Sequence, residues 1–532
     1  MSELDFNVSY ASHRVPMMGR NAVATSQPLA AQAGMRMLQQ GGNAVDAAIA
    51  SAMALTVLEP SGNGLGSDAF AIIWDGKQLH GLNASGRSPA AWNPERFAGR
   101  DAMPEIGWEA VTVPGAVSAW VELAERFGTL PLTTLAQPAI EYARDGFPVS
   151  PLIGHLWQRA YHKLKDQPGF VECFAPDGRP PRAGELFRNP AQAETLQKIA
   201  ETRGEAFYRG ELAEKIVAFA EQHGAALSLD DLKNHRADWV ELLSRPFAGG
   251  SVQELPPNGQ GIATLIALGI LEQWDIGRYE PDSVPWLHLS IEAMKLALAD
   301  LDRYVSDYDH LEFPAELLLS DDYLKQRAQL INPDRAGDFT FGSPQQSGTV
   351  YLSTADASGM MVSFIQSNYM GFGSGVVVPG TGISLQNRGC GFSLDPQHPN
   401  VVAGGKRPFH TIIPAFALDG DGQPLMSFGV MGGPMQAQGH LQMALRIMQH
   451  KQNPQAAIDA PRWRVEQGRA VVVEPGIDRN VLAKLREMGH QITLEDPLLG
   501  YNFGGAQAIV RDPQGFYIAA TESRKDGQAL VF

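Results

Sequence analysis

Residues 349–368 read TVYLSTADASGMMVSFIQSN, and this stretch holds the most informative pattern in the chain. Its two halves are rich in β-branched and aromatic residues, which favour strands. The residues between the halves, Asp356 to Gly359, have the composition of a turn. The pattern therefore predicts a β-hairpin with Thr349 at the first position of its first strand.

The segment before this hairpin differs from it in composition. Residues 331–348 read INPDRAGDFTFGSPQQSG, a polar run with Pro, Gly, Asp and Gln and with neither helical nor strand periodicity. Such a composition predicts a loop or linker. Thr349 is therefore expected to follow directly behind a linker that ends in Gly348.

A threonine in this position can cut its own chain. Its hydroxyl can attack the carbonyl of Gly348, which leaves room for the attack because it has no side chain, and the acyl group then moves from nitrogen to oxygen. Hydrolysis of the ester frees the α-amine of Thr349, and such an amine has a pKa of about 7.7–8.0, suited to a general base. The local pattern alone leaves open an ordinary threonine at a strand start.

The regions around the hairpin alternate between helices and strands. Residues 41–60, GGNAVDAAIASAMALTVLEP, predict a helix that begins after Asn43 as N-cap and ends before Pro60. AFAIIW and LHGL, residues 69–74 and 79–82, predict two strands joined by a turn.

Further along, two long amphipathic helices are predicted at residues 261–274 and 284–305, and the last third is rich in glycine and in strand-forming residues. Strands surrounded by helices predict a layered α/β architecture.

The composition restricts the class of protein. The chain has 532 residues, a hydrophobic fraction of 44% and a net charge of −16. This is enough apolar material for a large core and excludes a disordered chain. The length allows two to four ordinary domains or one intertwined body. The acidic balance disfavours nucleic acid as a partner.

Targeting and cofactor signals are weak. The N-terminus lacks the apolar run of a secretory signal, and no stretch of about 20 apolar residues predicts a membrane span. We therefore expect a cytoplasmic protein, unless a leader precedes this sequence. The two cysteines and 13 histidines show no ligand spacing, and no P-loop, HExxH or GxSxG motif occurs. Neither a metal nor an organic cofactor is expected.

Several separate motifs resemble the γ-glutamyltranspeptidase family, in order and spacing, from about Ala24 to Leu530. The part after the linker resembles the small subunit of that family, and the part before it resembles the large subunit. The motifs are GGNAVDAAIASAMALTVLEP, EYARDGF, ELPPNGQGI, EAMKLALADLDRY, GTVYLSTADASG, QSNYMGFGSG, GISLQNRG, KRPFHTIIP and GVMGGPMQ.

This resemblance implies a fold and a maturation step. The family has the four-layer αββα sandwich of N-terminal-nucleophile hydrolases. Thr349 matches its nucleophile, so cleavage between Gly348 and Thr349 would give a large-subunit region, 1–348, and a small-subunit region, 349–532. The two fragments are expected to stay associated, and a dimer of such pairs is one alternative.

The resemblance also implies roles for three residues near the nucleophile. Gly432 and Gly433 match the glycine pair whose backbone N–H groups form the oxyanion hole. Asn368 lies near the substrate-binding asparagine, with a register that is open by one residue.

The expected substrate pocket departs from the family pattern. Arg87 is nearest to the family's carboxylate-binding arginine but is displaced by about two positions. His410 and Thr411 stand where the family has paired serines. Gly391 replaces the aspartate that holds the substrate's α-ammonium, and Arg388 is close to it in sequence. These departures resemble the γ-glutamyltransferase-like branch, which includes cephalosporin and glutaryl-amide acylases.

The sequence therefore predicts a self-processing amidohydrolase or acyltransferase. Its substrate would be a γ-glutamyl amide like glutathione, and its acceptor would be water or an amine. One alternative is an acylase for glutaryl or cephalosporin-type amides. Another, from a different class, is an unprocessed homologue that binds ligands without catalysis.

Overall fold

The computed structural model describes residues 13–339, 348–496 and 502–532. Within these ranges it contains two seven-stranded antiparallel sheets. The first sheet has the strand order β1 (Met17–Gly19), β20 (Tyr517–Thr521), β19 (Gly505–Arg511), β15 (Pro424–Met431), β14 (Ala415–Leu418), β9 (Gly250–Glu254) and β8 (Leu243–Phe247).

The second sheet interleaves strands from before and after residue 348. Three of its strands follow that residue, and the other four precede it. The order is β21 (Gln528–Val531), β2 (Ala22–Thr25), β10 (Gly348–Ala355), β11 (Met361–Tyr369), β3 (Asp68–Trp74), β4 (Leu79–Asn83) and β7 (Asp238–Val240).

The predicted hairpin is confirmed as β10 and β11, which pair antiparallel in the middle of this sheet. Strand β2 pairs with β10 on the side away from β11, and β3 pairs with β11 on the side away from β10. Strand β10 begins at Gly348, one residue before the predicted start, and its register shifts between Gly348 and Val350. Thr349 therefore lies at a local irregularity, a feature that can redirect a side chain beside an active site.

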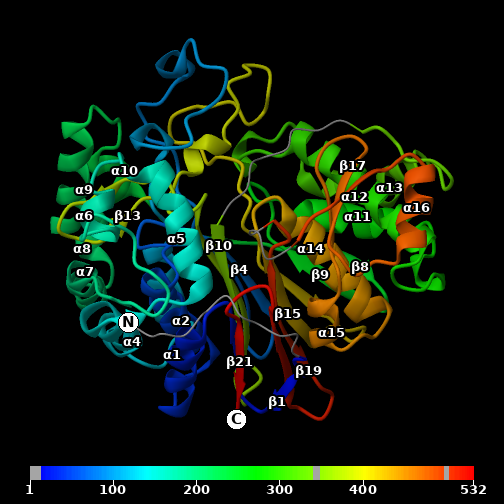
Figure 1. The fold of residues 1–532 in the computed structure, drawn as a ribbon, viewed down its shortest axis with the longest axis horizontal. Coiled ribbons are helices and arrows are strands. Elements are labelled where there is room, and N and C mark those ends of the chain that lie inside the picture. The colour runs from blue at the N-terminus through cyan, green and yellow to red at the C-terminus, as the bar shows by residue number, and fades with distance from the viewer. Residues whose placement is uncertain (1–12, 340–347, 497–501) are drawn as a thin grey trace.

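Helices cover the outer faces of the two sheets, which pack against each other through β10 and β15. Helices α1 (Pro28–Gln39) and α2 (Ala44–Leu58) contact the second sheet, on the blue side of Figure 1. Helices α11 (Gly261–Glu272) and α14 (Met435–Ala444) contact the first sheet on the opposite side. One apolar core lies between the sheets, and one lies beneath each helical layer.

Local sequence signals explain the principal helices. Asn43 caps α2 as predicted, with its side chain accepting the Asp46 N–H at 3.0 Å while the Asp46 carboxylate accepts the Asn43 N–H at 2.9 Å. All fifteen residues of α2 are buried, which its small alanine side chains permit. The predictions of β3, β4, α11 and the long helix α12 (Val284–Tyr304) are confirmed.

The remaining elements surround these layers. The helices are α3 (Ala116–Phe127), α4 (Leu132–Asp145), α5 (Pro151–Leu164), α6 (Phe170–Phe174), α7 (Pro190–Glu201), α8 (Glu205–Tyr208), α9 (Glu211–Gln222), α10 (Leu229–Asn234), α13 (Asp321–Ala328), α15 (Pro454–Asp459) and α16 (Arg479–Glu487). Short sheets contain β5 (Phe147–Pro148), β6 (Leu186–Phe187), β12 (Val377–Val378), β13 (Ile383–Ser384), β16 (Trp463–Val465), β17 (Ala470–Val473) and β18 (Gln491–Leu494).

Two further sequence predictions concern the linker before Thr349 and membrane spans. The predicted linker is described only for residues 331–339 and Gly348, and residues 340–347 lie outside the described ranges. Among the described helices, none combines the length and apolar character needed to cross a lipid bilayer.

Candidate active site

The Thr349 side chain lies buried at the start of β10, next to a hydroxyl of the neighbouring strand β11. Its Oγ1 is 3.1 Å from the Oγ of Ser367. The Ser367 hydroxyl donates to the carbonyl oxygen of Gly348 at 2.8 Å and accepts the N–H of Tyr369 at 2.7 Å. Since Ser367 has only one hydroxyl hydrogen, Thr349 is the donor in their contact. A hydrogen-bonded chain thus joins the Thr349 hydroxyl to the carbonyl of the peptide bond before it.

Glycine is required at position 348 for a reason that the structure makes explicit. A Cβ there would lie 2.5 Å from the carbonyl oxygen of Ser61, in the loop after α2. A Cβ at Gly62 would lie 3.2 Å from the Thr349 carbonyl oxygen. The loop therefore packs closely on the backbone around the 348–349 bond and holds it in place.

Gly432 and Gly433 form a turn directly after β15. Both have positive φ, +129° and +58°, which favours residues without a Cβ. The Gly433 carbonyl accepts from Nε2 of Gln260 at 2.8 Å, and the same nitrogen donates to the Thr411 carbonyl at 2.5 Å. Within the described residues, neither glycine N–H donates to a backbone carbonyl.

Arg388 and Thr411 meet in the same region. Nη1 of Arg388 donates to Oγ1 of Thr411 at 2.8 Å, and the guanidinium lies 4.4 Å from the centre of the Tyr369 ring. Arg388 is only 1% exposed, and its Nε and Nη2 have no hydrogen-bond acceptor among the described residues. Burial lowers the pKa of Arg388 to about 10, so the guanidinium stays charged at neutral pH.

Asp68 and His410 form a buried pair beside Arg388. Nε2 of His410 is 3.1 Å from Oδ2 of Asp68, whose other oxygen accepts the N–H groups of Gly86 and Gly115. Burial raises the pKa of Asp68 to about 7, although Arg388 lowers it. Burial likewise lowers the pKa of His410 well below its usual value. Asp68 is also the cross-strand partner of Ser367 in the β3–β11 pairing.

A cavity of about 510 Å³ opens beside this group. Its wall includes Gln260, Tyr369 and Pro434, which follows the glycine pair, together with Cys390 and Gly391. The glycine at 391 matters because a Cβ there would lie 2.7 Å from the Phe409 carbonyl oxygen. A larger side chain at this position would require the backbone to move.

Known proteins of similar sequence and structure show the family of this chain. The family model for gamma-glutamyltranspeptidase matches residues 30–532. This chain belongs to the gamma-glutamyltranspeptidase family. It is therefore an enzyme of the amidohydrolase and transferase type, produced as a proenzyme.

Three relatives of different activity resemble it over nearly their whole length. It is 36% identical to a glutathione hydrolase-like YwrD proenzyme of Bacillus subtilis, over 96% of this chain and 100% of the relative. It is 37% identical to an oxamate amidohydrolase proenzyme of Klebsiella pneumoniae, over 95% and 97%. A crystal structure of cephalosporin acylase from Bacillus halodurans matches with 48% identity and a TM-score of 0.95, over 100% and 99%.

Two of the predicted site residues lie apart from this group. Arg87 is partly exposed, and its Nη1 donates to Asp307 at 3.1 Å and to the Gly405 carbonyl at 3.3 Å. Asn368 is buried, with its amide bonded to the hydroxyls of Ser67 and Ser384. The next residue, Tyr369, lines the cavity in its place.

Four residues of the group, Asp68, Gln260, Ser367 and Tyr369, were not singled out by the sequence analysis. Gln260 lies within the motif ELPPNGQGI, and Ser367 and Tyr369 lie within QSNYMGFGSG, but neither motif indicated a role for these three residues. The only available signal was alternation along β11, which places Ser367 and Tyr369 on one face.

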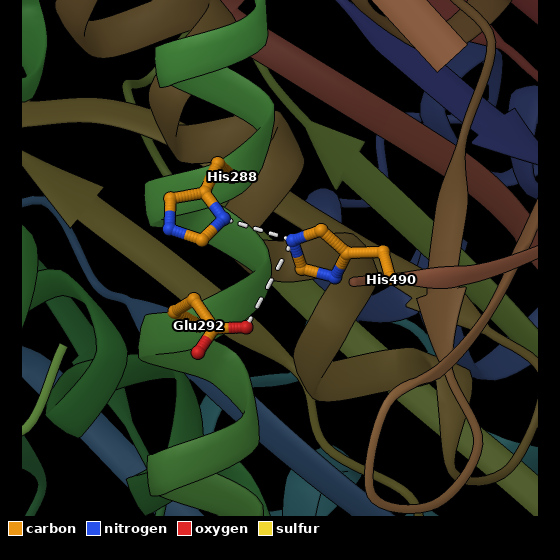
Figure 2. A group of neighbouring side chains, drawn as sticks. All are labelled: His288, Glu292 and His490. Atoms are coloured by element: carbon orange, nitrogen blue, oxygen red, sulfur yellow. Dashed lines mark hydrogen bonds and ion pairs between the residues drawn. The ribbon is translucent and has the colours of Figure 1, made fainter. Parts of the chain in front are cut away.

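One group of described side chains has the composition of a metal site, which the spacing of the histidines did not indicate. Ligand atoms of His288, Glu292 and His490 lie within 4.8 Å of one another, all buried (Figure 2). However, Nδ1 of His288 is 2.8 Å from Nε2 of His490, and the Lys295 ammonium donates to Oε1 of Glu292 at 2.8 Å. Ligand atoms of all three residues are thus already engaged, by a hydrogen bond between the histidines and by the Lys295 ammonium.

Proposed function

We propose that this enzyme cuts its own chain between Gly348 and Thr349 and that Thr349 then attacks amide substrates as an N-terminal nucleophile. The hydrogen-bonded chain from Thr349 through Ser367 to the Gly348 carbonyl carries this proposal. The helices that cover two facing sheets support the four-layer αββα sandwich of N-terminal-nucleophile hydrolases as its fold.

In the first reaction, Oγ1 of Thr349 bonds to the carbonyl carbon of Gly348. Its proton passes to Ser367, and the Ser367 proton passes to the Gly348 oxygen, which would otherwise carry a full negative charge. Collapse of this intermediate breaks the C–N bond, returns a proton to the Thr349 nitrogen and leaves an ester. Water then hydrolyses the ester and frees the new α-amine.

In the second reaction, the α-amine accepts the proton of the Thr349 hydroxyl as the latter attacks a substrate amide. The N–H groups of Gly432 and Gly433 would stabilise the oxyanion, since donors aimed at a developing charge are worth about 2.7–4 kcal/mol each. The amine of the substrate leaves with a proton. Water or an amine then takes the acyl group from Thr349.

The two alternative classes of substrate are γ-glutamyl amides, like glutathione, and glutaryl or cephalosporin-type amides. The charges near the cavity favour the second class. Position 391 carries no carboxylate to hold an α-ammonium, and the nearby cation Arg388 would repel one. We therefore propose an acyl group without a free α-ammonium.

Gel electrophoresis of the purified protein tests the first part. We expect two fragments, residues 1–348 and 349–532, and only the intact chain in Thr349→Ala. An uncut wild-type chain would refute the self-cleavage.

Comparison of γ-glutamyl and glutaryl p-nitroanilides tests the choice of substrate. We expect glutaryl turnover to equal or exceed γ-glutamyl turnover. A strong preference for the γ-glutamyl compound would restore the glutathione-like assignment.

A further inference from the structure

The guanidinium of Arg388 presents an empty pair of donors. Its Nε and Nη2 hydrogens point from the same edge of the planar group, and neither nitrogen has an acceptor among the residues that the structure describes. Arg96 shows how such an edge is filled elsewhere in the chain: its Nε and Nη2 donate to the two oxygens of Glu109 at 2.8 and 2.7 Å. The edge of Arg388 thus has the shape of a carboxylate receptor without a carboxylate.

No acidic group of the described residues fills this role. Asp68 interacts with Arg388 electrostatically: the Asp68 carboxylate raises the pKa of Arg388, and the Arg388 guanidinium lowers the pKa of Asp68. Its oxygens are already engaged by Gly86, Gly115 and His410, and it makes no ion pair with Arg388 within 4.0 Å. Because unmet charged donors are costly inside a protein, an arrangement of this kind is expected where a ligand completes it.

The empty edge belongs to the reaction centre. The Thr411 hydroxyl accepts a hydrogen bond from Arg388. The Thr411 and Gly433 carbonyls both accept from Nε2 of Gln260. On the other side, Tyr369 lies two residues after Ser367, which contacts Thr349. An anion at Arg388 would therefore lie close to the carbonyl that Thr349 attacks, within the acyl part of the same substrate.

Tyr369 separates this edge from the open cavity. It lines the cavity, its ring stacks over the Arg388 guanidinium, and its φ of +77° is uncommon for a residue with a side chain. Such backbone strain is characteristic of functional positions. A substrate would reach Arg388 when the Tyr369 side chain moves aside.

We propose that Arg388 binds a carboxylate at the far end of the acyl group, with Tyr369 as a cover, so that the substrates are monoamides of short dicarboxylic acids. This inference rests on the proposed role of Thr349. It names a specificity residue that is distinct from the nucleophile, the glycine pair and Arg87.

The test uses the processed enzyme and two p-nitroanilides of equal chain length, glutaryl, with a terminal carboxylate, and pentanoyl, without one. We expect wild type to prefer the glutaryl compound at least 100-fold in kcat/KM. Arg388→Met should lose most of this preference through a higher KM, and Arg388→Lys should restore part of it. Pentanoyl kcat/KM should fall by a much smaller factor than glutaryl kcat/KM in Arg388→Met. Arg96→Met is the matched control and should behave as wild type.

The outcomes separate the two proposals. A processed wild type that hydrolyses neither compound nor γ-glutamyl p-nitroanilide contradicts the proposed amidase function. Hydrolysis without preference for the carboxylate overturns the role of Arg388, and this comparison needs no variant to fold. Equal losses on both compounds in a well-folded Arg388→Met would show a merely structural arginine and would also overturn it.

Discussion

Two of the buried clusters that contain cations, around Lys295 and around Arg388, differ in how completely the protein satisfies the cation. The Lys295 ammonium donates to Glu292 and to the Gly337 carbonyl, and neither Lys295 nor Glu292 is exposed. Arg388 is equally buried, but two of its nitrogens lack acceptors in the described part of the chain. The chain can therefore neutralise a buried cation with its own groups. Where a buried cation lacks such partners, as at Arg388, we infer that a ligand supplies them.

The clusters also differ in position. The Lys295 cluster joins α12 to the segment before the proposed cleavage site and to residue 490 beyond it. The Arg388 cluster comprises Arg388, Thr411 and Tyr369. It is linked to Thr349 along strand β11, because Tyr369 lies two residues after Ser367, which contacts Thr349. We therefore expect substitutions in the first to act on stability and substitutions in the second to act on catalysis.

The largest effect on stability is expected for Lys295→Met. Removing one partner leaves Glu292 as an unpaired buried charge, which costs about 3–5 kcal/mol. Urea unfolding measures the loss, and Lys163→Met, which removes an exposed ammonium paired with Glu105, is the control with a cost below about 1 kcal/mol. Equal losses of stability in the two variants would show that the buried Lys295 ion pair contributes no more than a surface pair, and would contradict its structural role.

The pH dependence of stability should come partly from Asp68. Its pKa is about 7 in the folded state against 3.8 ordinarily, so the folded state holds this proton more tightly. The stabilisation is complete below pH 3.8 and is lost as the pH rises through 7, by up to about 4 kcal/mol for a shift of three units. Asp68→Asn should lack this slope. Parallel unfolding curves of variant and wild type from pH 4 to 8 would contradict the assignment.

Ser367→Ala should slow self-cleavage. It removes the donor to the Gly348 carbonyl, and loss of one oxyanion donor costs about 2.7–4 kcal/mol, or 10²–10³ in rate. The appearance of fragments with time after synthesis measures it. Ser367→Thr keeps the hydroxyl and should process at a rate near that of wild type. Normal processing of the alanine variant would remove Ser367 from the mechanism.

The smallest effect on stability is expected for Arg388→Met. Exchanging a poorly satisfied buried charge for an apolar side chain of similar length should change the free energy of unfolding by less than about 1 kcal/mol, or increase it. The same urea experiment measures it. A loss as large as that of Lys295→Met would place Arg388 with the structural clusters.

The sequence predicted the elements that depend on local patterns. The β10–β11 hairpin, the Asn43 cap and helices α11 and α12 were all visible in composition, periodicity or capping residues. The family motifs then marked Thr349 and the glycine pair as candidate site residues, and their roles stay predictions. Both kinds of signal lie within short stretches of chain.

The partners of those residues depend on distant contacts. Asp68 meets His410, and Gln260 meets Gly433, across more than 170 positions of the chain. Such pairs have no local signature. The sequence also left the register at Asn368 open by one residue. One step along a strand turns a side chain to the opposite face, and Tyr369 is the residue that lines the cavity.

The interleaved second sheet would have a consequence for the lifetime of a cut enzyme. Strands β10 and β11, from after the cut, lie between β2 and β3, from before it, so the two chains could not part without breaking the middle of a sheet. Once unfolded, they would have to find each other in a second-order reaction without the connection that first guided them. The cut protein would then persist because it unfolds slowly, as a kinetically trapped product of a single-chain folding event.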